Sequence, residues 1–182
     1  MIHNNIRIVN TQSLQELTYN EVGEICIQSP SRMIGYFDNE EATEELFRIH
    51  PDGYEWLHTG ALRYIDEDGF LYLVGRMKRV ILTTRDGVAY KVFPNIPEEV
   101  LGSHMSVEQI CIVGAKDGDD SVLQANVVLK PEDRGKKLII EQELRRICNE
   151  ELPSYSRPTF YVFLDKLPLT AAGKIDYRAL EK

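Results

Sequence analysis

The chain has 182 residues, of which 43% are hydrophobic and 27% are charged, and its formal net charge at pH 7 is −8. This size fits one ordinary domain, or a small domain with part of another, and the acidity argues against nucleic acid as a bulk partner. No apolar run approaches the length that crosses a bilayer, and the N-terminus lacks the zones of a signal peptide. We therefore expect a cytoplasmic protein with no membrane span and no nucleic-acid partner.

The charge is unevenly distributed along the chain. Residues 1–75 carry 4 basic and 13 acidic side chains, whereas residues 76–182 carry 17 basic and 16 acidic ones. Such an asymmetry indicates two structural units that meet near Gly75. The second unit begins with a basic cluster that could face a small polyanion, in which only Asp86 opposes five basic side chains: Arg76, Lys78, Arg79, Arg85 and Lys91.

The first 74 residues have the alternation that is typical of antiparallel strands. Asp38 or Asn39 can cap a short helix that runs to about Phe47, because several glutamates favour its first turns. Residues 66–69 form a turn of the Asp/Gly type. The expected strands and extended pieces are residues 6–9, 23–28, 56–60, 62–65 and 70–74.

Residues 76–182 mix helical and strand patterns. Ile140, Leu144, Ile147 and Cys148 recur at the spacing of an amphipathic helix over residues 138–152. The other expected elements are a hairpin of residues 79–83 and 88–92, strands at 107–113, 122–129 and 160–164, and short helices at 94–101 and 177–181. The fold class is therefore α+β, in which an antiparallel β-rich segment precedes a small α+β domain with a three-stranded sheet and flanking helices.

The three cysteines are expected to be buried free thiols. Cys26, Cys111 and Cys148 are odd in number, far apart, and each lies inside an apolar pattern. No Cys-x-x-Cys or Cys/His spacing occurs, so we predict no metal site.

The histidines carry no pattern typical of catalysis. His58 is expected to pack beside Trp56, because no partner base or metal spacing surrounds it. His50 lies in a loop and shows no functional pattern.

The stretch Leu167–Tyr177 contains the most distinctive local motif. Pro168 fixes the approach of the chain, and Gly173 lets the backbone before Lys174 pass close to a partner. Taken alone, the pattern predicts a surface loop in front of a short last helix.

This loop resembles the Pro-x-Thr-x-x-Gly-Lys signature that closes the adenylate-forming enzymes, a superfamily of acyl-CoA synthetases, adenylation domains and luciferases. The resemblance extends from about Ile6 to Leu180. It implies that residues 1–75 are the closing segment of a large N-terminal domain and residues 76–182 a mobile C-terminal lid. The motifs that carry it, in family order, are Gly23–Ile25, Gly35–Tyr36, Trp56–Gly60, Asp66–Tyr72, Gly75–Arg76, Pro94–Val100 and Pro168–Lys174.

The resemblance implies a two-step ligase reaction. A small carboxylic acid attacks ATP, with Mg²⁺ present, to give an acyl-adenylate and pyrophosphate. The thiol of CoA, or of a carrier protein's phosphopantetheine, then takes the acyl group and releases AMP. Between the two steps the small domain rotates about a hinge.

Three roles follow from the resemblance. Lys174 matches the catalytic lysine of the adenylation step, where a flexible ammonium can bridge a carboxylate oxygen and the α-phosphate. Arg76 matches the arginine that contacts the nucleotide ribose. Lys78 matches the hinge position.

The hairpin of the second unit matches the segment that lines the CoA or pantetheine tunnel in the thioester step. Its candidate residues are Thr84, Arg85, Gly87 and Lys91, with Gly87 as the pivot. This loop is about two residues longer than the common form.

Two positions depart from the family pattern. The family writes Thr-Gly-Asp, whose Asp holds both ribose hydroxyls, but here the third residue is Ala61. A hydrogen bond to a charged acceptor is worth roughly 1.5–3 kcal/mol, so weaker ATP binding, a substitute carboxylate and lost activity all stay open. Leu82 stands where several members carry a lysine of the thioester-step face.

The family's ATP phosphate loop, adenine-contacting and magnesium-binding segments and acyl pocket have no counterpart in this sequence. We therefore expect a C-terminal fragment that needs the missing N-terminal catalytic domain, is inactive alone and binds no cofactor tightly. Two alternatives stay open: an adenylation domain that loads an amino or aryl acid onto a carrier protein, and a non-catalytic module that retains the fold. The acyl substrate and the oligomeric state are not encoded in these residues.

Overall fold

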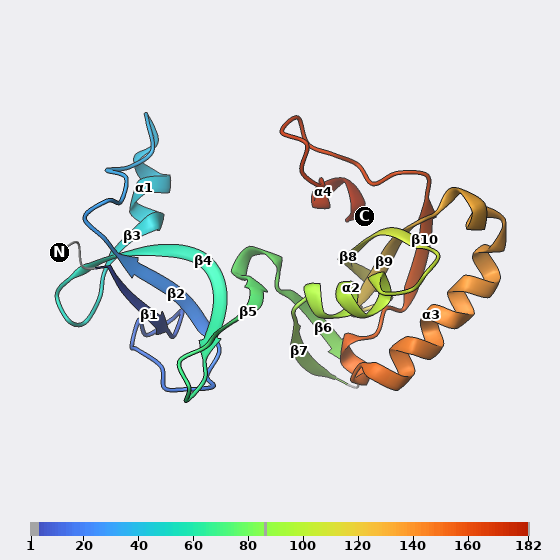
Figure 1. Cartoon of the computed structure of the whole chain (residues 1–182), viewed down its shortest axis with the longest axis horizontal. Helices are drawn as coiled ribbons and strands as arrows, with labels where there is room; N and C mark the ends of the chain where they lie inside the picture. Colours follow the sequence, from blue (N-terminus) through green and yellow to red (C-terminus); the bar gives the residue numbers. More distant parts are fainter. Residues whose placement is uncertain (1–3, 86, 182) are drawn as a thin grey trace. The chain divides into compact units, whose positions relative to one another are not determined.

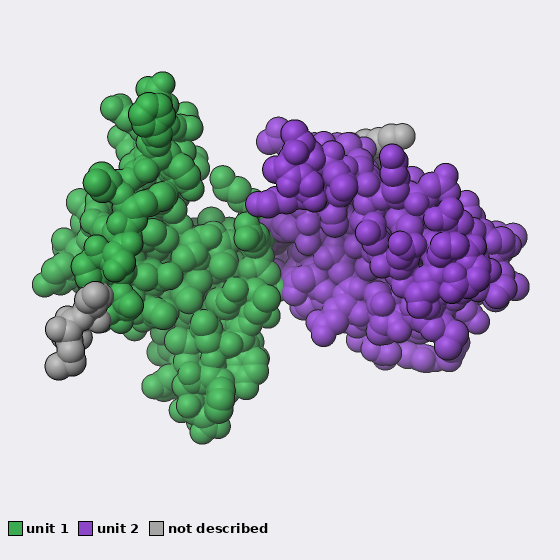
Figure 2. Space-filling model, turned by 45° about the horizontal axis from the view of Figure 1, so that its top comes forward, with its two compact units in different colours: residues 1–78 green, residues 79–182 purple. Residues whose placement is uncertain are grey.

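The computed structural model describes residues 4–85 and 87–181. Its Cα positions divide the chain into unit 1, Met1–Lys78, and unit 2, Arg79–Lys182, which Figure 2 shows in different colours. The sequence places the boundary slightly earlier, after Gly75. The assignment of the two parts to an N-terminal segment and a C-terminal lid stays a prediction.

Unit 1 is built on an antiparallel sheet (Figure 1), as the sequence predicted. Within the described residues its strands follow the order β1-β2-β4-β3, and β5 pairs with β4 beside this path. Val9, Cys26 and Trp56 form its core and are each at most 1% exposed. The elements are β1 (Asn5–Val9), β2 (Gly23–Gln28), α1 (Glu40–Leu46), β3 (Phe47–Ile49), β4 (Glu55–Ile65), β5 (Leu71–Arg76) and the 3-10 turn η1 (Met77–Arg79), which crosses into unit 2.

The predicted helix before Phe47 is present and is capped as expected. The Asn39 side chain accepts a hydrogen bond from the Ala42 amide at 3.0 Å, and two glutamates occupy the first turn. The chain then continues directly as β3, a strand that the sequence did not predict because three residues carry too little periodicity.

β4 is one strand where the sequence predicted two extended pieces. Gly60 lies in its middle with φ +67°, a left-handed conformation that glycine adopts without steric cost. The strand therefore passes through the Thr59–Gly60 position and continues to pair with both β2 and β5.

Unit 2 contains the predicted three-stranded sheet, in the order β10-β9-β8, and a separate hairpin of β6 and β7. β8 and β9 are antiparallel, whereas β10 runs parallel to β9. The turn between β8 and β9 is tighter than expected, because pairing extends to Asp117 and Asp120. The elements are β6 (Ile81–Arg85), β7 (Val88–Val92), α2 (Asn95–Gly102), β8 (Val107–Asp117), β9 (Asp120–Leu129), η2 (Pro131–Lys136), α3 (Lys137–Glu151), η3 (Ser154–Ser156), β10 (Phe160–Leu164) and α4 (Tyr177–Leu180).

The three-stranded sheet is covered on both faces. Alternate residues of a strand point to opposite faces, so Ile112 joins a core with Leu101 of α2 and Leu144 of α3. Its neighbours Cys111 and Val113 join a second core, which the C-terminal segment completes with Leu167 and Leu180. The C-terminal segment that carries Lys174 is therefore fixed to the face of the sheet opposite α2 and α3.

All three cysteines are buried and free, as predicted. Cys26 lies in the core of unit 1, and Cys111 and Cys148 lie in the two cores of unit 2.

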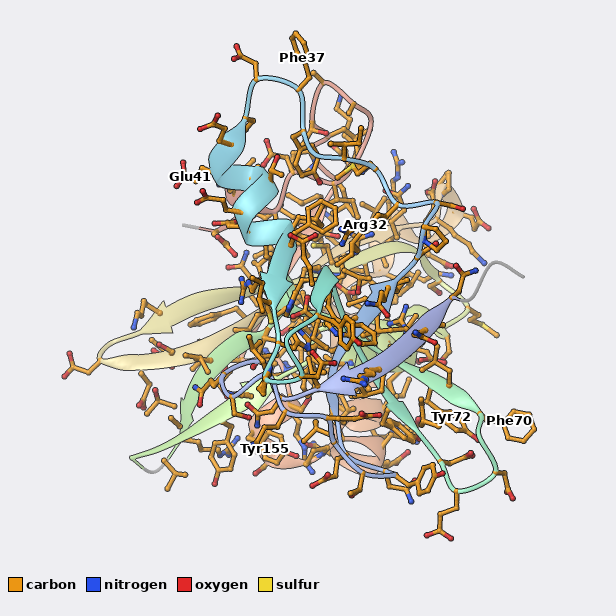
Figure 3. The ribbon with its side chains drawn as sticks, turned by 90° about the vertical axis from the view of Figure 1, so that its left-hand side faces the viewer. Arg32, Phe37, Glu41, Phe70, Tyr72 and Tyr155 are labelled. Carbon is orange, nitrogen blue, oxygen red and sulfur yellow. The ribbon has the colours of Figure 1, made fainter. Side chains whose placement is uncertain are left out.

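Unit 1 also exposes several large apolar side chains. Figure 3 shows Phe37 before α1 and Phe70 at the β4–β5 turn extending away from the ribbon, and both are exposed. The helices of the described residues are all too short or too polar to span a bilayer.

Candidate functional site

Lys174 lies on a tight turn at the surface of unit 2. The Gly173 amide donates to the Thr170 carbonyl at 2.9 Å, and the Thr170 amide donates to the Lys174 carbonyl at 2.7 Å. Gly173 has φ +74°, which a residue with a Cβ adopts only at a steric cost. The exposed Lys174 side chain therefore extends from a fixed backbone.

The base of this turn is closed by further backbone contacts. Leu169 and Ile175 form an antiparallel bridge, and the Asp176 amide donates to the Pro168 carbonyl at 2.8 Å. Asp176 then caps α4, since its side chain accepts from the Ala179 amide at 3.3 Å. Residues 168–176 are called the Lys174 turn below.

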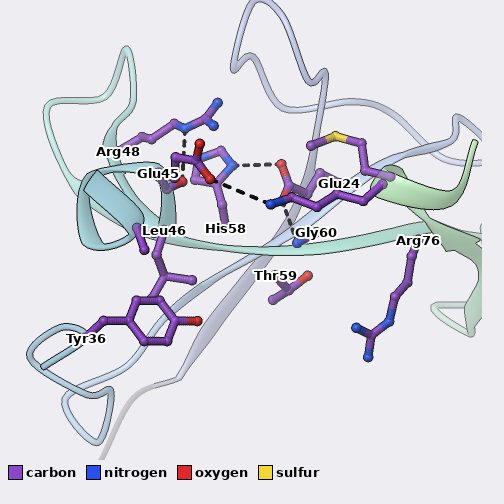
Figure 4. Close-up of a pocket in the computed structure, with 12 residues that line it drawn as sticks. Glu24, Tyr36, Glu45, Leu46, Arg48, His58, Thr59, Gly60 and Arg76 are labelled. Atoms are coloured by element: carbon purple, nitrogen blue, oxygen red, sulfur yellow. Dashed lines mark hydrogen bonds and ion pairs between the residues drawn. The ribbon is translucent and has the colours of Figure 1, made fainter. Parts of the chain in front are cut away.

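Arg76 and Lys78 line one cleft of about 360 Å³ in unit 1, shown in Figure 4. Its lining residues come from Tyr36 and α1, from β2, β3 and β4, and from the end of β5 and η1. Lys78 Nζ lies 3.7 Å from Glu45 Oε2, and both side chains are well exposed, so this pair contributes little to stability. In Figure 4 the Arg76 guanidinium makes no marked contact with the other residues drawn.

Ala61 lies directly opposite Arg76 in the register of β4 and β5. The Ala61 amide donates to Thr59 Oγ1 at 3.1 Å, which fixes the backbone at this point. The position where the family carries its aspartate is therefore next to the predicted ribose-contacting arginine, and it presents only a methyl group there.

A buried network that the sequence did not predict forms part of the wall of this cleft. His58 Nδ1 is 2.8 Å from Glu24 Oε2, His58 Nε2 is 3.0 Å from His50 Nε2, and the Gly60 amide donates to Glu24 Oε1 at 2.7 Å. The three side chains, Glu24, His50 and His58, are at most 5% exposed and are called the buried network below. It ties β2, β4 and the segment after β3 together.

Burial and hydrogen bonding have opposite effects on the pKa of Glu24 in this network. Burial alone would raise the pKa of Glu24, but the hydrogen bonds from His58 and Gly60 and the nearby charges outweigh it, so the pKa is lowered. Burial lowers the pKa of His50 and favours its neutral form. A carboxylate that accepts these bonds stays ionised in the interior of unit 1.

His50 lies in the loop after β3, as expected, but its structural contacts were not predicted. Its ring stacks on Trp56, with ring centroids 5.7 Å apart, and meets His58 edge-on. The signal that could have revealed it was weak, because the antiparallel pairing of β3 with β4 is what brings His50 beside Trp56 and His58.

Among the described residues, Cys26, His50 and His58 offer metal-ligand atoms within 4.8 Å of one another. However, Cys26 Sγ lies 3.6 Å from His58 Nδ1, whereas His50 approaches His58 Nε2. The lone pairs of these two ring nitrogens diverge, so the three donors do not face one point. Burial also raises the pKa of Cys26 to about 12, which disfavours the thiolate that metals bind.

The predicted CoA-loop residues are distributed over the β6–β7 hairpin. Thr84 and Arg85 line a second cleft of about 220 Å³, in which Arg85 Nη1 donates to the Ser154 carbonyl at 2.8 Å. Gly87 has φ +75°, and Lys91 is exposed on β7. Asp86, which was expected in the same turn, lies outside the described residues.

Sequence reasoning missed an aromatic support for this hairpin. Tyr90 of β7 stacks on Tyr155 of η3 with ring centroids 4.6 Å apart, and Thr83 Oγ1 donates to the Tyr155 carbonyl at 3.3 Å. The hairpin is therefore braced by the segment that follows α3.

Comparison with known protein families identifies the segment that ends at Lys174. A family model described as the AMP-binding enzyme C-terminal domain matches residues 97–174, which end on the candidate lysine. Residues 97–174 belong to this family. The matched residues cover most of α2, the three-stranded sheet, α3 and most of the Lys174 turn.

Relatives extend the similarity beyond this domain. The chain is 38% identical over 160 residues to a 2-succinylbenzoate–CoA ligase of Bacillus mycoides, covering 88% of this chain and 30% of that protein. It is 33% identical over 165 residues to a long-chain-fatty-acid–CoA ligase of Escherichia coli O157:H7, covering 91% and 27%. The predicted resemblance to the C-terminal part of an acyl-CoA synthetase is confirmed.

A solved structure supports the fold of the chain. The o-succinylbenzoate CoA synthetase of Bacillus subtilis, in complex with its acyl-adenylate intermediate, matches with a TM-score of 0.79 at 34% identity, covering 97% of this chain and 33% of that one. The chain spans about a third or less of the length of these relatives.

Proposed function

We propose that the chain supplies the C-terminal lid of an AMP-forming acid–thiol ligase whose large N-terminal domain lies outside this sequence. The observation that carries the proposal is Lys174, which a glycine turn holds exposed at the end of an AMP-binding enzyme C-terminal domain. The CoA ligases among the relatives support the same reaction class.

In the adenylation step a carboxylate oxygen attacks the α-phosphorus of ATP, the bond to pyrophosphate breaks, and an acyl-adenylate forms. The Lys174 ammonium donates hydrogen bonds to the attacking carboxylate and to the α-phosphate, where negative charge gathers in the transition state. The fixed backbone of the turn supports this role, because a positioned charge stabilises a transition state without reorganising.

Arg76 contacts the nucleotide ribose, and Lys78 is the hinge of the domain rotation. The exposed guanidinium of Arg76 in the 360 Å³ cleft supports the first role. The division of the chain directly after Lys78 supports the second, since hinges are a few residues between rigid bodies.

Apart from the contact of Lys174 with the α-phosphate, the residues that would hold Mg²⁺ and the ATP phosphates belong to the part of the ligase outside this sequence. The described carboxylates in the cleft do not fit a magnesium site, because Glu24 is committed to His58 and Gly60, and Glu45 faces Lys78.

In the thioester step the CoA thiol attacks the acyl carbonyl and AMP leaves. The β6–β7 hairpin, with Thr84, Arg85, Gly87 and Lys91, lines the path of the pantetheine arm. The bracing of this hairpin by Tyr155 supports a rigid wall. The buried free thiols favour the reducing cytoplasm as its location.

The test is a substitution of Lys174 in the longer ligase polypeptide. Lys174→Ala should lower carboxylate-dependent ATP–pyrophosphate exchange by about 10²–10³-fold, because one electrostatic contact to the transition state is lost. Lys166→Ala, which removes another exposed lysine of the same segment, is the matched control and should leave exchange unchanged. Unchanged exchange in Lys174→Ala would refute the catalytic assignment. The 182-residue chain alone should show no exchange.

Ala61 favours a second candidate, a non-catalytic module that retains the fold. Its methyl group faces the position of Arg76 where the family carries a carboxylate. No exchange by the longer polypeptide, with any of a broad panel of aliphatic and aromatic acids, would favour this candidate.

A further inference from the structure

Arg79, the first residue of unit 2, makes contacts with three separate parts of that unit. Its Nη2 and Nη1 atoms bind Glu98 Oε1 at 2.6 Å and Oε2 at 3.1 Å, a bidentate pair with α2. Nη2 also lies 3.4 Å from the Ile112 carbonyl of β8, and its guanidinium carbon lies 4.2 Å from the ring centroid of Tyr177 in α4. One side chain thus joins α2, β8 and α4.

The Arg79–Glu98 pair is more than a surface ion pair. Both side chains are mostly buried, at 24% and 17% exposed, and the Glu98 carboxylate also accepts the Ile112 amide at 2.8 Å. Bidentate geometry and partial burial make such a pair stronger and more directional than an exposed one. The carboxylate of Glu98 therefore fixes the guanidinium that lies over the Tyr177 ring.

Tyr177 connects this plane to the Lys174 turn. It is the first residue of α4 and follows Asp176, whose amide closes the base of the turn on Pro168. Ile175 bridges Leu169 and packs with Tyr177 against the second core of unit 2. The C-terminal end of the Lys174 turn is therefore attached to Arg79 through one aromatic ring.

We propose that Arg79 is a positioning residue for Lys174. Arg79 directly follows the hinge candidate Lys78, and its side chain anchors the base of the Lys174 turn through Tyr177. This inference rests on the proposed function. Arg79 contacts no substrate in this role. It fixes the orientation of the turn within unit 2, so that Lys174 rotates with the hinge as part of a rigid body. A displacement of about 1 Å at such a group can cost about 10²-fold in rate.

The first test measures the turn without any activity. In the 182-residue chain, Arg79→Met should accelerate amide hydrogen exchange in residues 168–177 at least several-fold, with β8 and β9 still protected. Tyr177→Leu, which removes the ring, should do the same. Unchanged exchange in both Arg79→Met and Tyr177→Leu would overturn the proposal.

A matched control exists in the same unit. Arg145 also pairs with a glutamate, Glu141, and lies over a tyrosine ring, that of Tyr161 at 4.5 Å. Arg145→Met removes the same chemistry away from the turn and should leave exchange in residues 168–177 unchanged. Equal acceleration in both variants would show general loosening of unit 2 and would also overturn the proposal.

The second test separates positioning from a merely structural role. In the longer polypeptide, Arg79→Met should lower kcat for adenylation by about tenfold to a hundredfold, with KM for ATP unchanged. Arg79→Lys keeps the charge but not the bidentate fork and should recover part of the loss. If the hydrogen exchange responds but kcat does not, Arg79 does not position Lys174. If instead Lys174→Ala leaves adenylation intact, the proposed function fails. The hydrogen-exchange result still reports on the contact between Arg79 and Tyr177.

Discussion

The Lys174 turn and the buried network are built from different kinds of contact. Every backbone hydrogen bond described in the turn joins residues no more than eight positions apart, and its lysine is exposed. In the buried network Glu24 is bonded to His58 and Gly60, which are 34 and 36 positions away, and the carboxylate is shielded from water. The turn can therefore lose its functional side chain at little cost in stability, whereas loss of a network side chain breaks hydrogen bonds between distant parts of unit 1.

The most severe test of this contrast is Glu24→Ala. It leaves His58 and the Gly60 amide without their buried partner, so we expect the free energy of unfolding of unit 1 to fall by about 3–5 kcal/mol. Trp56, the single tryptophan of the chain, lies in the core of unit 1 and reports its urea unfolding by fluorescence. Glu21→Ala, an exposed carboxylate nearby in sequence, is the control and should cost far less. A loss below about 1 kcal/mol for Glu24→Ala, the scale of one neutral hydrogen bond, would contradict a structural role.

A smaller effect is expected inside the turn itself. Gly173→Ala places a Cβ at φ +74° with no atom nearby to clash, so the cost is the backbone strain alone, about 1–2 kcal/mol. We expect faster hydrogen exchange at the Thr170 and Lys174 amides and no change in the Trp56 transition. Gly135→Ala, also in open space but without a positive φ, is the matched control. A shifted Trp56 transition in Gly173→Ala would break the separation between the two regions.

The mildest test uses the buried thiols. Burial raises the pKa values of Cys26 and Cys111 from 9.0 to about 12, so the thiolate fraction at pH 8 should be roughly a thousandfold lower than for an unperturbed thiol. The thiols of the native chain should therefore react with a disulfide reagent such as DTNB only when the unit that buries them opens. Glu24→Ala should accelerate labelling of Cys26 and leave Cys111 slow. Equal acceleration at both cysteines would show that the two units do not open separately.

Local patterns explain what could be predicted from the sequence. The Asn39 cap, the spacing of Ile140, Leu144 and Cys148, and the turn signals around Gly87 each lie within a few residues, and the structure contains the helix or hairpin that each one predicts. Lys174 belongs to the same class, because its motif is contiguous. The family resemblance then supplied roles that no local pattern contains.

What could not be predicted depends on distant pairing. Glu24 looks like any glutamate in an alternating strand until β2 pairs with β4 and places it beside His58. Arg79 looks like one more charge of a basic cluster until α2 and α4 bring Glu98 and Tyr177 to it. Periodicity decides which face a residue occupies, but not which residue of another element it meets there.

The parallel pairing of β10 with β9 has a consequence for how the chain is made. β9 is the central strand of its sheet, yet one of its two neighbours leaves the ribosome only after α3 has been synthesised. Until then the hairpin of β8 and β9 exposes a row of unpaired amides and carbonyls along β9, a template for pairing with another chain. A message truncated before Phe160 would therefore yield an aggregation-prone chain. In the complete chain, β10 protects unit 2 against aggregation because it pairs with the exposed edge of β9.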